Sequence, residues 1–291
     1  MAVTVIDGTK HNDNDYSLNS RCIETLWKME DRHFWHASRN RWILSALKQH
    51  AVLPPAKVLD VGCGSGAVSR ALATAGYTVT GVDTAEKLVR KANDRVPHQN
   101  FVVGDIASLP EGLRVGYECV GLFDVLEHVE SPQDLLSASL LHVERGSRVI
   151  VTVPALRSLH TVIDDLSGHK KRYEMGEVRE LLESVGVAGV KEYGIFRTTL
   201  PILKAHRRKF GDHADCPADS ETASTLMIDY LRVPTAPVNL IMSLLCSLER
   251  WAGLESAQNR EAPSILAVGT VSGALEFDRK VVDSCLSDNS E

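Results

Sequence analysis

The chain has 291 residues, enough for one large α/β domain or two small ones. Apolar residues make up 44% of it, an ordinary share that permits a full core, and its formal net charge is −6. A negative net charge argues against a nucleic-acid partner, since phosphate contacts need a basic face. The apolar run at 240–248 is too short to span a bilayer, so we expect no membrane partner.

The cysteines and the N-terminus indicate the compartment. The six cysteines form no Cys-x-x-Cys pair, and the first residues have neither a basic start nor an apolar stretch of signal-peptide length. We therefore expect reduced thiols and a cytoplasmic protein. Residues 1–22 are polar and rich in turn formers, and they are expected to be a mobile segment. One domain is expected over 23–276, followed by a tail at 277–291.

The first elements of this domain are helical. Residues 23–49 predict two helices, broken near His33–Trp35. Strands and helices then alternate from 57 to about 155, the pattern of a parallel sheet. The first strand begins at Val58 and leads into a glycine-rich turn.

That turn carries the strongest signal of the chain. Its stretch reads Val58-Leu59-Asp60-Val61-Gly62-Cys63-Gly64-Ser65-Gly66, and a helical pattern follows. A strand, a glycine turn and a helix N-terminus together favour an anionic or nucleotide-like ligand, because free backbone N–H groups and the helix dipole face the crevice. The residues Gly62-x-Gly64-x-x-Ala67 also satisfy the dinucleotide pattern, with Asp83 about 20 residues further on. The glycines alone therefore leave a nicotinamide oxidoreductase open.

The next strands end in polar residues. Asp83-Thr84 ends the second strand, and Thr84 is a candidate cap for a helix starting at Ala85. A third strand over 101–103 runs into Gly104-Asp105-Ile106, and a fourth over about 119–125 runs into Leu126-Glu127-His128-Val129. The carboxyl ends of parallel strands meet at one edge of a sheet, which is where α/β sites lie.

The rest of the chain is more varied. A helix opening at Ser131-Pro132, a strand over 148–153, a helix over 177–185, a strand over 187–193 and a late edge strand over 264–271 are predicted. Residues 205–223 are polar and aperiodic, which indicates a disordered loop or a lid. Helices over 224–254 are expected as a cap or a dimer surface. Together 196–262 would form a helical insertion or lid.

In order, these motifs resemble the class I S-adenosylmethionine (SAM)-dependent methyltransferases, in the small-molecule branch that contains the ubiquinone-biosynthesis O-methyltransferases. The resemblance covers about 24–195 and returns near 263–271. It implies an α/β fold, a Rossmann-like doubly wound, mostly parallel seven-strand-type sheet, and SAM as the methyl donor. Against a short-chain dehydrogenase, none of the six tyrosines has a lysine four positions on.

The resemblance also implies a cofactor site. In the family the acid after the second strand, here Asp83, accepts from the ribose hydroxyls, and the acid after the third, here Asp105, accepts from the adenine amino group. Asp60 would steady the glycine turn, and Arg39 is a candidate for the methionine carboxylate. The full set implied is Asp60, Gly62, Gly64, Asp83, Thr84, Asp105, Ile106, Phe123, Asp124 and Arg39.

Candidate general bases and substrate-binding residues follow the fourth and fifth strands. His128 has the pKa range of a general base, or it has a structural role. The segment Gly168-His169-Lys170-Lys171-Arg172-Tyr173 resembles the Gly-His-x-Arg-Arg-Tyr segment of such enzymes. His169 is there a second candidate base, and Arg172 and Tyr173 are candidates for substrate binding.

Trp35 is a candidate to cover the sulfonium, or else a packing residue. No metal is expected, since Asp212, His213 and Asp215 lack ligand spacing. The sequence thus predicts methyl transfer to a small molecule, with O-methylation as the default. Transfer to S, N or carboxyl groups of an amino-acid-like or carboxylate substrate, and SAM binding without turnover, remain alternatives.

Overall fold

The structure is a computed structural model that describes residues 3–5, 20–109, 116–208 and 221–272. Most of the segment 1–22, the whole tail 277–291 and the residues Asp212, His213 and Asp215 lie outside these ranges. Residues Thr4–Val5 nevertheless form a short strand that pairs with 102–103. These two residues are therefore part of the sheet and not of a mobile segment.

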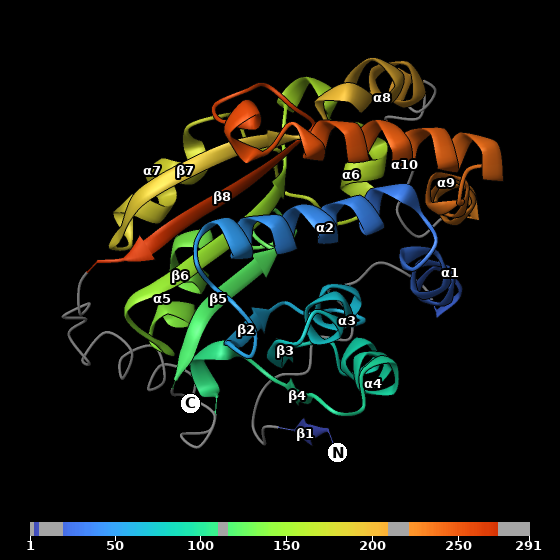
Figure 1. The fold of residues 1–291 in the computed structure, drawn as a ribbon. Helices are drawn as coiled ribbons and strands as arrows, with labels where there is room; N and C mark the ends of the chain where they lie inside the picture. Colours follow the sequence, from blue (N-terminus) through green and yellow to red (C-terminus); the bar gives the residue numbers. More distant parts are fainter. Residues whose placement is uncertain (1–2, 6–19, 110–115, 209–220, 273–291) are drawn as a thin grey trace.

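An eight-stranded, mostly parallel sheet forms the centre of the molecule (Figure 1). Its strand order is β1-β4-β3-β2-β5-β6-β8-β7, and the β6–β8 and β8–β7 pairs are antiparallel. The strands are β1 (Thr4–Val5), β2 (Lys57–Val61), β3 (Thr78–Asp83), β4 (Asn100–Val103), β5 (Tyr117–Phe123), β6 (Val143–Pro154), β7 (Val187–Ile195) and β8 (Ser264–Val271). The predicted Rossmann-like fold class is confirmed.

One strand prediction is wrong in its position. β8 was expected at an edge of the sheet, but it lies between β6 and β7. Seven of its eight residues are buried, as an almost continuous apolar run requires of a strand covered on both faces. The edge strand on that side is β7.

Helices cover both faces of the sheet. They are α1 (Ser20–Glu30), α2 (Phe34–Gln49), α3 (Ala67–Thr74), α4 (Glu86–Arg95), α5 (Pro132–Leu140), α6 (Val162–Leu166), α7 (Glu177–Ser184), α8 (Leu200–Arg207), α9 (Glu221–Leu231) and α10 (Ala236–Trp251). Alternate strand residues face opposite sides, so Leu59 packs in the core that includes α5 and α7, whereas Val58 packs in the core of α2, α3 and α10. The break expected near His33–Trp35 is confirmed, since His33 Nδ1 accepts from the Trp35 amide at 3.1 Å between α1 and α2.

The segment between β7 and β8 carries α8, α9 and α10, so the helices expected over 224–254 are present. Asn239 ties α10 to the α1–α2 turn: its Oδ1 accepts from the Phe34 amide, and its Nδ2 donates to the Arg32 carbonyl. The outer face of α10 is apolar and exposed at Leu240, Ile241, Leu244, Leu248 and Trp251. Within the described ranges, every helix falls short of the length and apolar character that a bilayer crossing needs.

Candidate active site

A cavity of about 640 Å³ opens beside the glycine turn, between the sheet and the helices α8–α10. The predicted site residues that line it are Trp35, Arg39, Asp60, Gly62, Gly64, Phe123, Asp124, His128, His169 and Arg172. Met227, Tyr230 and Met242, from the helices between β7 and β8, line it from the other side. Asp83, Thr84, Asp105, Ile106 and Tyr173 are not among the lining residues.

The turn between β2 and α3 requires glycine at Gly62 and Gly66. Gly62 and Gly66 both have left-handed φ values, 71° and 78°. A Cβ on Gly62 would lie 2.5 Å from Val125, and one on Gly66 would lie 2.9 Å from the backbone of Ala92. A Cβ on Gly64, by contrast, would meet no atom within 4 Å, although Gly64 lines the cavity. The backbone at Gly64 is therefore open to close approach by a ligand.

Asp83 joins this turn to the end of β3. Its Oδ2 accepts from the Gly64 amide and its Oδ1 from the Ala85 amide, each at 2.9 Å. Burial raises the pKa of its carboxyl, and the backbone donors lower it. The expected cap by Thr84 is wrong: α4 begins at Glu86, its N-cap Ala85 has no side-chain hydrogen bond, and Thr84 is exposed.

Asp105 and Ile106 lie in the loop after β4. The exposed Asp105 carboxylate accepts from the Ala107 amide at 2.9 Å and so caps a short 3-10 helix, Ile106–Ser108. The Ile106 side chain is buried, and its carbonyl lies 2.9 Å from the His142 ring. Asp105 therefore lies exposed at the carboxyl end of β4, and its contact with the adenine stays a prediction.

Two further carboxylates lie deeper. Asp60 is 1% exposed and accepts from Ser69 Oγ at 2.5 Å. Burial raises the pKa of Asp60 to about 7. Asp124 follows β5 with a left-handed φ of 57°, pairs with the buried Arg39, and accepts from Thr152 at 2.9 Å. A non-glycine residue in this conformation is strained, and such strain gathers at functional sites.

The acceptor candidates form a second group around Asp164. This carboxylate is fully buried and contacts His169 at 3.0 Å, Arg172 at 2.7 Å and Arg207. Although burial opposes it, the hydrogen bond from His169 and the charges of Arg207 and Arg172 hold the pKa of Asp164 well below its usual range. Arg172 also donates to the Ala155 carbonyl at 2.9 Å, so its guanidinium is committed within the protein.

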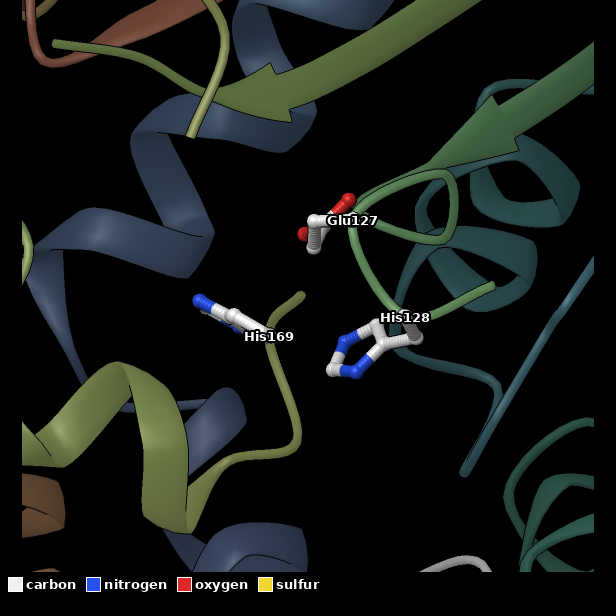
Figure 2. A group of neighbouring side chains, drawn as sticks. All are labelled: Glu127, His128 and His169. Atoms are coloured by element: carbon white, nitrogen blue, oxygen red, sulfur yellow. The ribbon is translucent and has the colours of Figure 1, made fainter. Parts of the chain in front are cut away.

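Glu127, His128 and His169 face one another, with the two rings 4.8 Å apart (Figure 2). Burial lowers the pKa of His128 to about 4, and the neighbouring His169 adds to this effect. Burial, together with the charge of Asp124, raises the pKa of Glu127 well above its usual range. At neutral pH, His128 is therefore a neutral imidazole.

Two predicted substrate residues differ in burial. The Tyr173 ring is 1% exposed, and its hydroxyl donates to the Leu126 carbonyl at 3.1 Å. One face of Trp35 stacks on Phe196, with ring centroids 3.9 Å apart. Tyr173 is therefore not proposed as a substrate-binding residue, whereas Trp35 lines the cavity.

Sequence reasoning missed Glu127, Asp164 and Arg207 as site residues. Asp164 had a local signal, since Thr161-x-x-Asp164 forms a capping box at the start of α6. Glu127 stands inside the Leu-Glu-His motif, but nothing in the motif predicts that its carboxyl is buried. Arg207 comes from α8, and only the tertiary fold brings it to Asp164.

The strand order, the glycine turn and the acids at the ends of β3 and β4 define the fold of the class I SAM-dependent methyltransferases. Residues 34–192 match the family model described as a methyltransferase domain. This match covers more than half of the chain, and the chain belongs to that family. SAM is the methyl donor in this family, and the open backbone at Gly64 and the buried acids Asp60 and Asp83 fit such a cofactor.

Named relatives agree with this assignment. The chain is 32% identical over 126 residues to the ubiquinone biosynthesis O-methyltransferase of Coxiella burnetii (strain Dugway 5J108-111), covering 42% of this chain and 52% of that protein. It is 33% identical over 122 residues to the protein of the same name from Burkholderia pseudomallei (strain 1710b), covering 36% and 47%. The chain thus spans about half the length of the curated relatives it matches.

A solved structure supports the fold. Phosphoethanolamine N-methyltransferase 2 of Haemonchus contortus, in complex with phosphomonomethylethanolamine and S-adenosylhomocysteine, superposes with a TM-score of 0.58 at 15% identity. The superposition covers 92% of this chain and 61% of that one. At this identity the likeness concerns the fold alone.

Proposed function

We propose that this protein transfers the methyl group of SAM to a hydroxyl of a small molecule. The observation that carries the proposal is the cluster of Glu127, His128 and His169 at the cavity. A hydroxyl must lose its proton as the new C–O bond forms, and an imidazole at the cavity suits that task. Similarity to enzymes named as O-methyltransferases supports the same acceptor class.

The roles of the cofactor residues form part of this proposal. When bound, SAM supplies a methyl group on a sulfonium that is already a good leaving group. Asp83 and Asp105 would accept from the ribose and the adenine, while Asp60, Phe123 and Asp124 would lie along the methionine part. Gly62 and Gly64 would admit the cofactor to the turn. The protein's main work is then to position the two reactants and to exclude water.

An anionic acceptor is less favoured by the charges in the cavity. Arg172 is paired with Asp164, which it shares with Arg207, and Arg39 is paired with Asp124, so each of these guanidinium groups already has a carboxylate partner. The Arg197 guanidinium, in the turn after β7, lies 3.6 Å from the buried Glu249. A carboxylate acceptor would have to compete with these internal partners for each arginine.

The test is a search for acceptors. Purified protein, SAM and a panel of phenols, alcohols, amines, thiols and carboxylic acids would be assayed for S-adenosylhomocysteine and for methylated product. A methyl ether is the expected product. Methylation of amines, thiols or acids alone would overturn the acceptor class. Binding of S-adenosylhomocysteine without any product across the panel would favour the non-catalytic alternative.

We further infer that the partner of this chain is a second copy, docked through the outer face of α10. Leu240, Ile241, Leu244, Leu248 and Trp251 lie on one side of the helix and are 55–87% exposed. Together they present roughly 600 Å² of apolar surface, near the ~800 Å² per partner of a standard interface. No Lys or Arg occurs from Ala236 to Glu249, whereas a helix that binds a membrane surface carries such charges beside its apolar face.

Sedimentation measurements test this surface. The wild-type protein is expected to be a dimer and Leu244→Glu a monomer, because a buried charge would face its own copy across the two-fold axis. The control is Lys204→Glu on the exposed side of α8, which should leave the dimer intact. A monomeric wild-type protein, or a dimeric Leu244→Glu variant, would overturn the assignment.

A further inference from the structure

The cluster formed by Glu127, His128 and His169 has the composition of a metal site. Each residue offers one ligand atom, and these three atoms lie within 4.8 Å of one another. Glu127 and His128 come from the loop after β5, and His169 from the loop after α6, so the three side chains converge from two segments (Figure 2). All three line the cavity.

Glu127 is the unusual member. Its residue is 1% exposed, and neither carboxyl oxygen has a hydrogen-bond partner among the described residues. An unsatisfied buried polar group costs about 1–3 kcal/mol, and more when it is charged. The arginines that could neutralise it are engaged elsewhere, Arg39 with Asp124 and Arg172 with Asp164. The fold therefore holds a carboxyl at the cavity for which it supplies no partner of its own.

The two histidines are held as metal ligands usually are. The Nδ1 atom of His169 lies 3.0 Å from the Asp164 carboxylate, an arrangement that fixes the ring and leaves Nε2 available. The ring of His128 is hydrogen-bonded to the backbone of Gly168.

We propose that Glu127, His128 and His169 bind a divalent transition-metal cation of the Zn²⁺ type. Two imidazoles and one carboxylate suit Zn²⁺, Mn²⁺ or Fe²⁺ better than Mg²⁺ or Ca²⁺, which prefer oxygen ligands. Three protein ligands leave at least one coordination position open, as in catalytic zinc sites. Ligand atoms up to 4.8 Å apart must draw closer around an ion, which side-chain rotation allows because all three border a cavity.

The open position gives the cation a task in the reaction, and this part rests on the proposed function. A hydroxyl bound to a divalent cation is more acidic, so its proton leaves to solvent at neutral pH. The oxygen then attacks the methyl carbon, the C–O bond forms as the C–S bond breaks, and the thioether product departs. The imidazoles then act as ligands rather than as bases.

Titration calorimetry with Zn²⁺ on the chelator-treated full chain tests the site directly. One saturable site is expected in the wild-type protein. Glu127→Gln, His128→Asn and His169→Asn should each weaken it by more than the 10–100-fold that loss of a second-shell partner costs. Matched controls are Glu130→Gln, with an 84% exposed side chain, and His98→Asn, an exposed histidine on another loop. Unchanged S-adenosylhomocysteine affinity shows that each variant is folded.

The outcomes separate the two proposals. Absence of saturable binding, or equal Zn²⁺ affinity in Glu127→Gln and Glu130→Gln, would overturn the metal site. Zn²⁺ binding that depends on the cluster, without methylation of any hydroxyl, would overturn the proposed acceptor and leave the metal site standing. Methylation of a hydroxyl at full rate in chelator would overturn the role of the cation and leave the proposed function standing.

Discussion

The guanidinium of Arg39, in the middle of α2, is paired with the carboxylate of Asp124, 85 residues further along the chain. The arginine side chain is 9% exposed and the aspartate 26%. Asp124 also carries the left-handed φ of the turn after β5. The pair therefore fixes the helix that covers one face of the sheet to the strand end beside the glycine turn.

Arg39→Gln should destabilise the protein by about 1–3 kcal/mol, because it leaves a partly buried carboxylate without its cation. The matched control is Arg70→Gln, whose partner Asp31 is 37% exposed and whose own side chain is 43% exposed. That change should cost less than about 1 kcal/mol. Urea unfolding measures both values, and equal small losses would contradict the importance of the Arg39–Asp124 pair.

Asp83→Ala should weaken binding of S-adenosylhomocysteine by about 1.5–3 kcal/mol, the range for hydrogen bonds to charged groups. The same change removes an acceptor from the Gly64 and Ala85 amides, so Asp83→Asn serves as a second, milder variant. Asp94→Ala, on the exposed side of α4, is the control. Calorimetry that finds wild-type affinity in a folded Asp83→Ala variant would remove Asp83 from the cofactor site.

Asp60→Asn should raise the stability of the cofactor-free protein above pH 7. The pKa of Asp60 is raised to about 7 from its ordinary value of 3.8, so the folded state binds a proton that the unfolded state releases between these values. Its stabilising contribution is full below pH 4 and is lost as the pH rises to 7. The free energy of unfolding of the variant should exceed that of the wild-type protein by on the order of 2–4 kcal/mol at pH 8, and should equal it at pH 4. A gain that does not depend on pH would show that Asp60 does not titrate in this way.

Gly66→Ala should destabilise the protein more than Gly146→Ala. Both glycines have positive φ, 78° and 93°, so both changes carry the same kind of backbone strain. A Cβ on Gly66 would also lie 2.9 Å from Ala92, whereas one on Gly146 would meet nothing within 4 Å. We expect the free energy of unfolding to fall by about 1 kcal/mol in Gly146→Ala and by at least ~2 kcal/mol in Gly66→Ala. Equal melting temperatures would mean that α4 moves away from the turn without cost.

His128→Asn should lower turnover by about 10²–10⁴, with little change in SAM affinity. Because the pKa of His128 is about 4, the neutral form persists across the neutral range and is lost only as the pH falls through 4. Single-turnover rates should therefore show no titration of His128 between about pH 5.5 and 8.5. An inflection near pH 6.5 that disappears in His128→Asn would contradict the lowered pKa.

The fold was predictable because its signals are local, and the cofactor residues are a prediction from the same signals. An apolar run, three glycines and an acid after each strand follow one another within short stretches of chain, and the structure brings them to one edge of the sheet. The position of β8 was not predictable in this way. An apolar strand carries no mark of which neighbours it will pair with, and the register of β8 with β6 and β7 is set by contacts more than 65 residues away in the chain.

The properties of the residues proposed to bind the methyl acceptor depend on their burial in the tertiary structure, which the sequence pattern does not encode. His128 looked like a base with an ordinary pKa, but burial lowers that pKa to about 4. Arg172 looked like an anion site, but Asp164 occupies it. Glu127 became notable only when both of its oxygens were found buried without partners.

Ile195 and Ser264, the residues that bound the α8–α10 segment, are direct partners in the β7–β8 ladder. The whole segment thus leaves the sheet and returns to it at a single point, like a long loop on a hairpin. A replacement that keeps the α10 side chains of the shared core with α2 and α3, such as Met242 and Cys246, would leave the strand order and the glycine turn in place. An engineer could therefore graft different segments between these two residues and sample new acceptors on an unchanged donor platform.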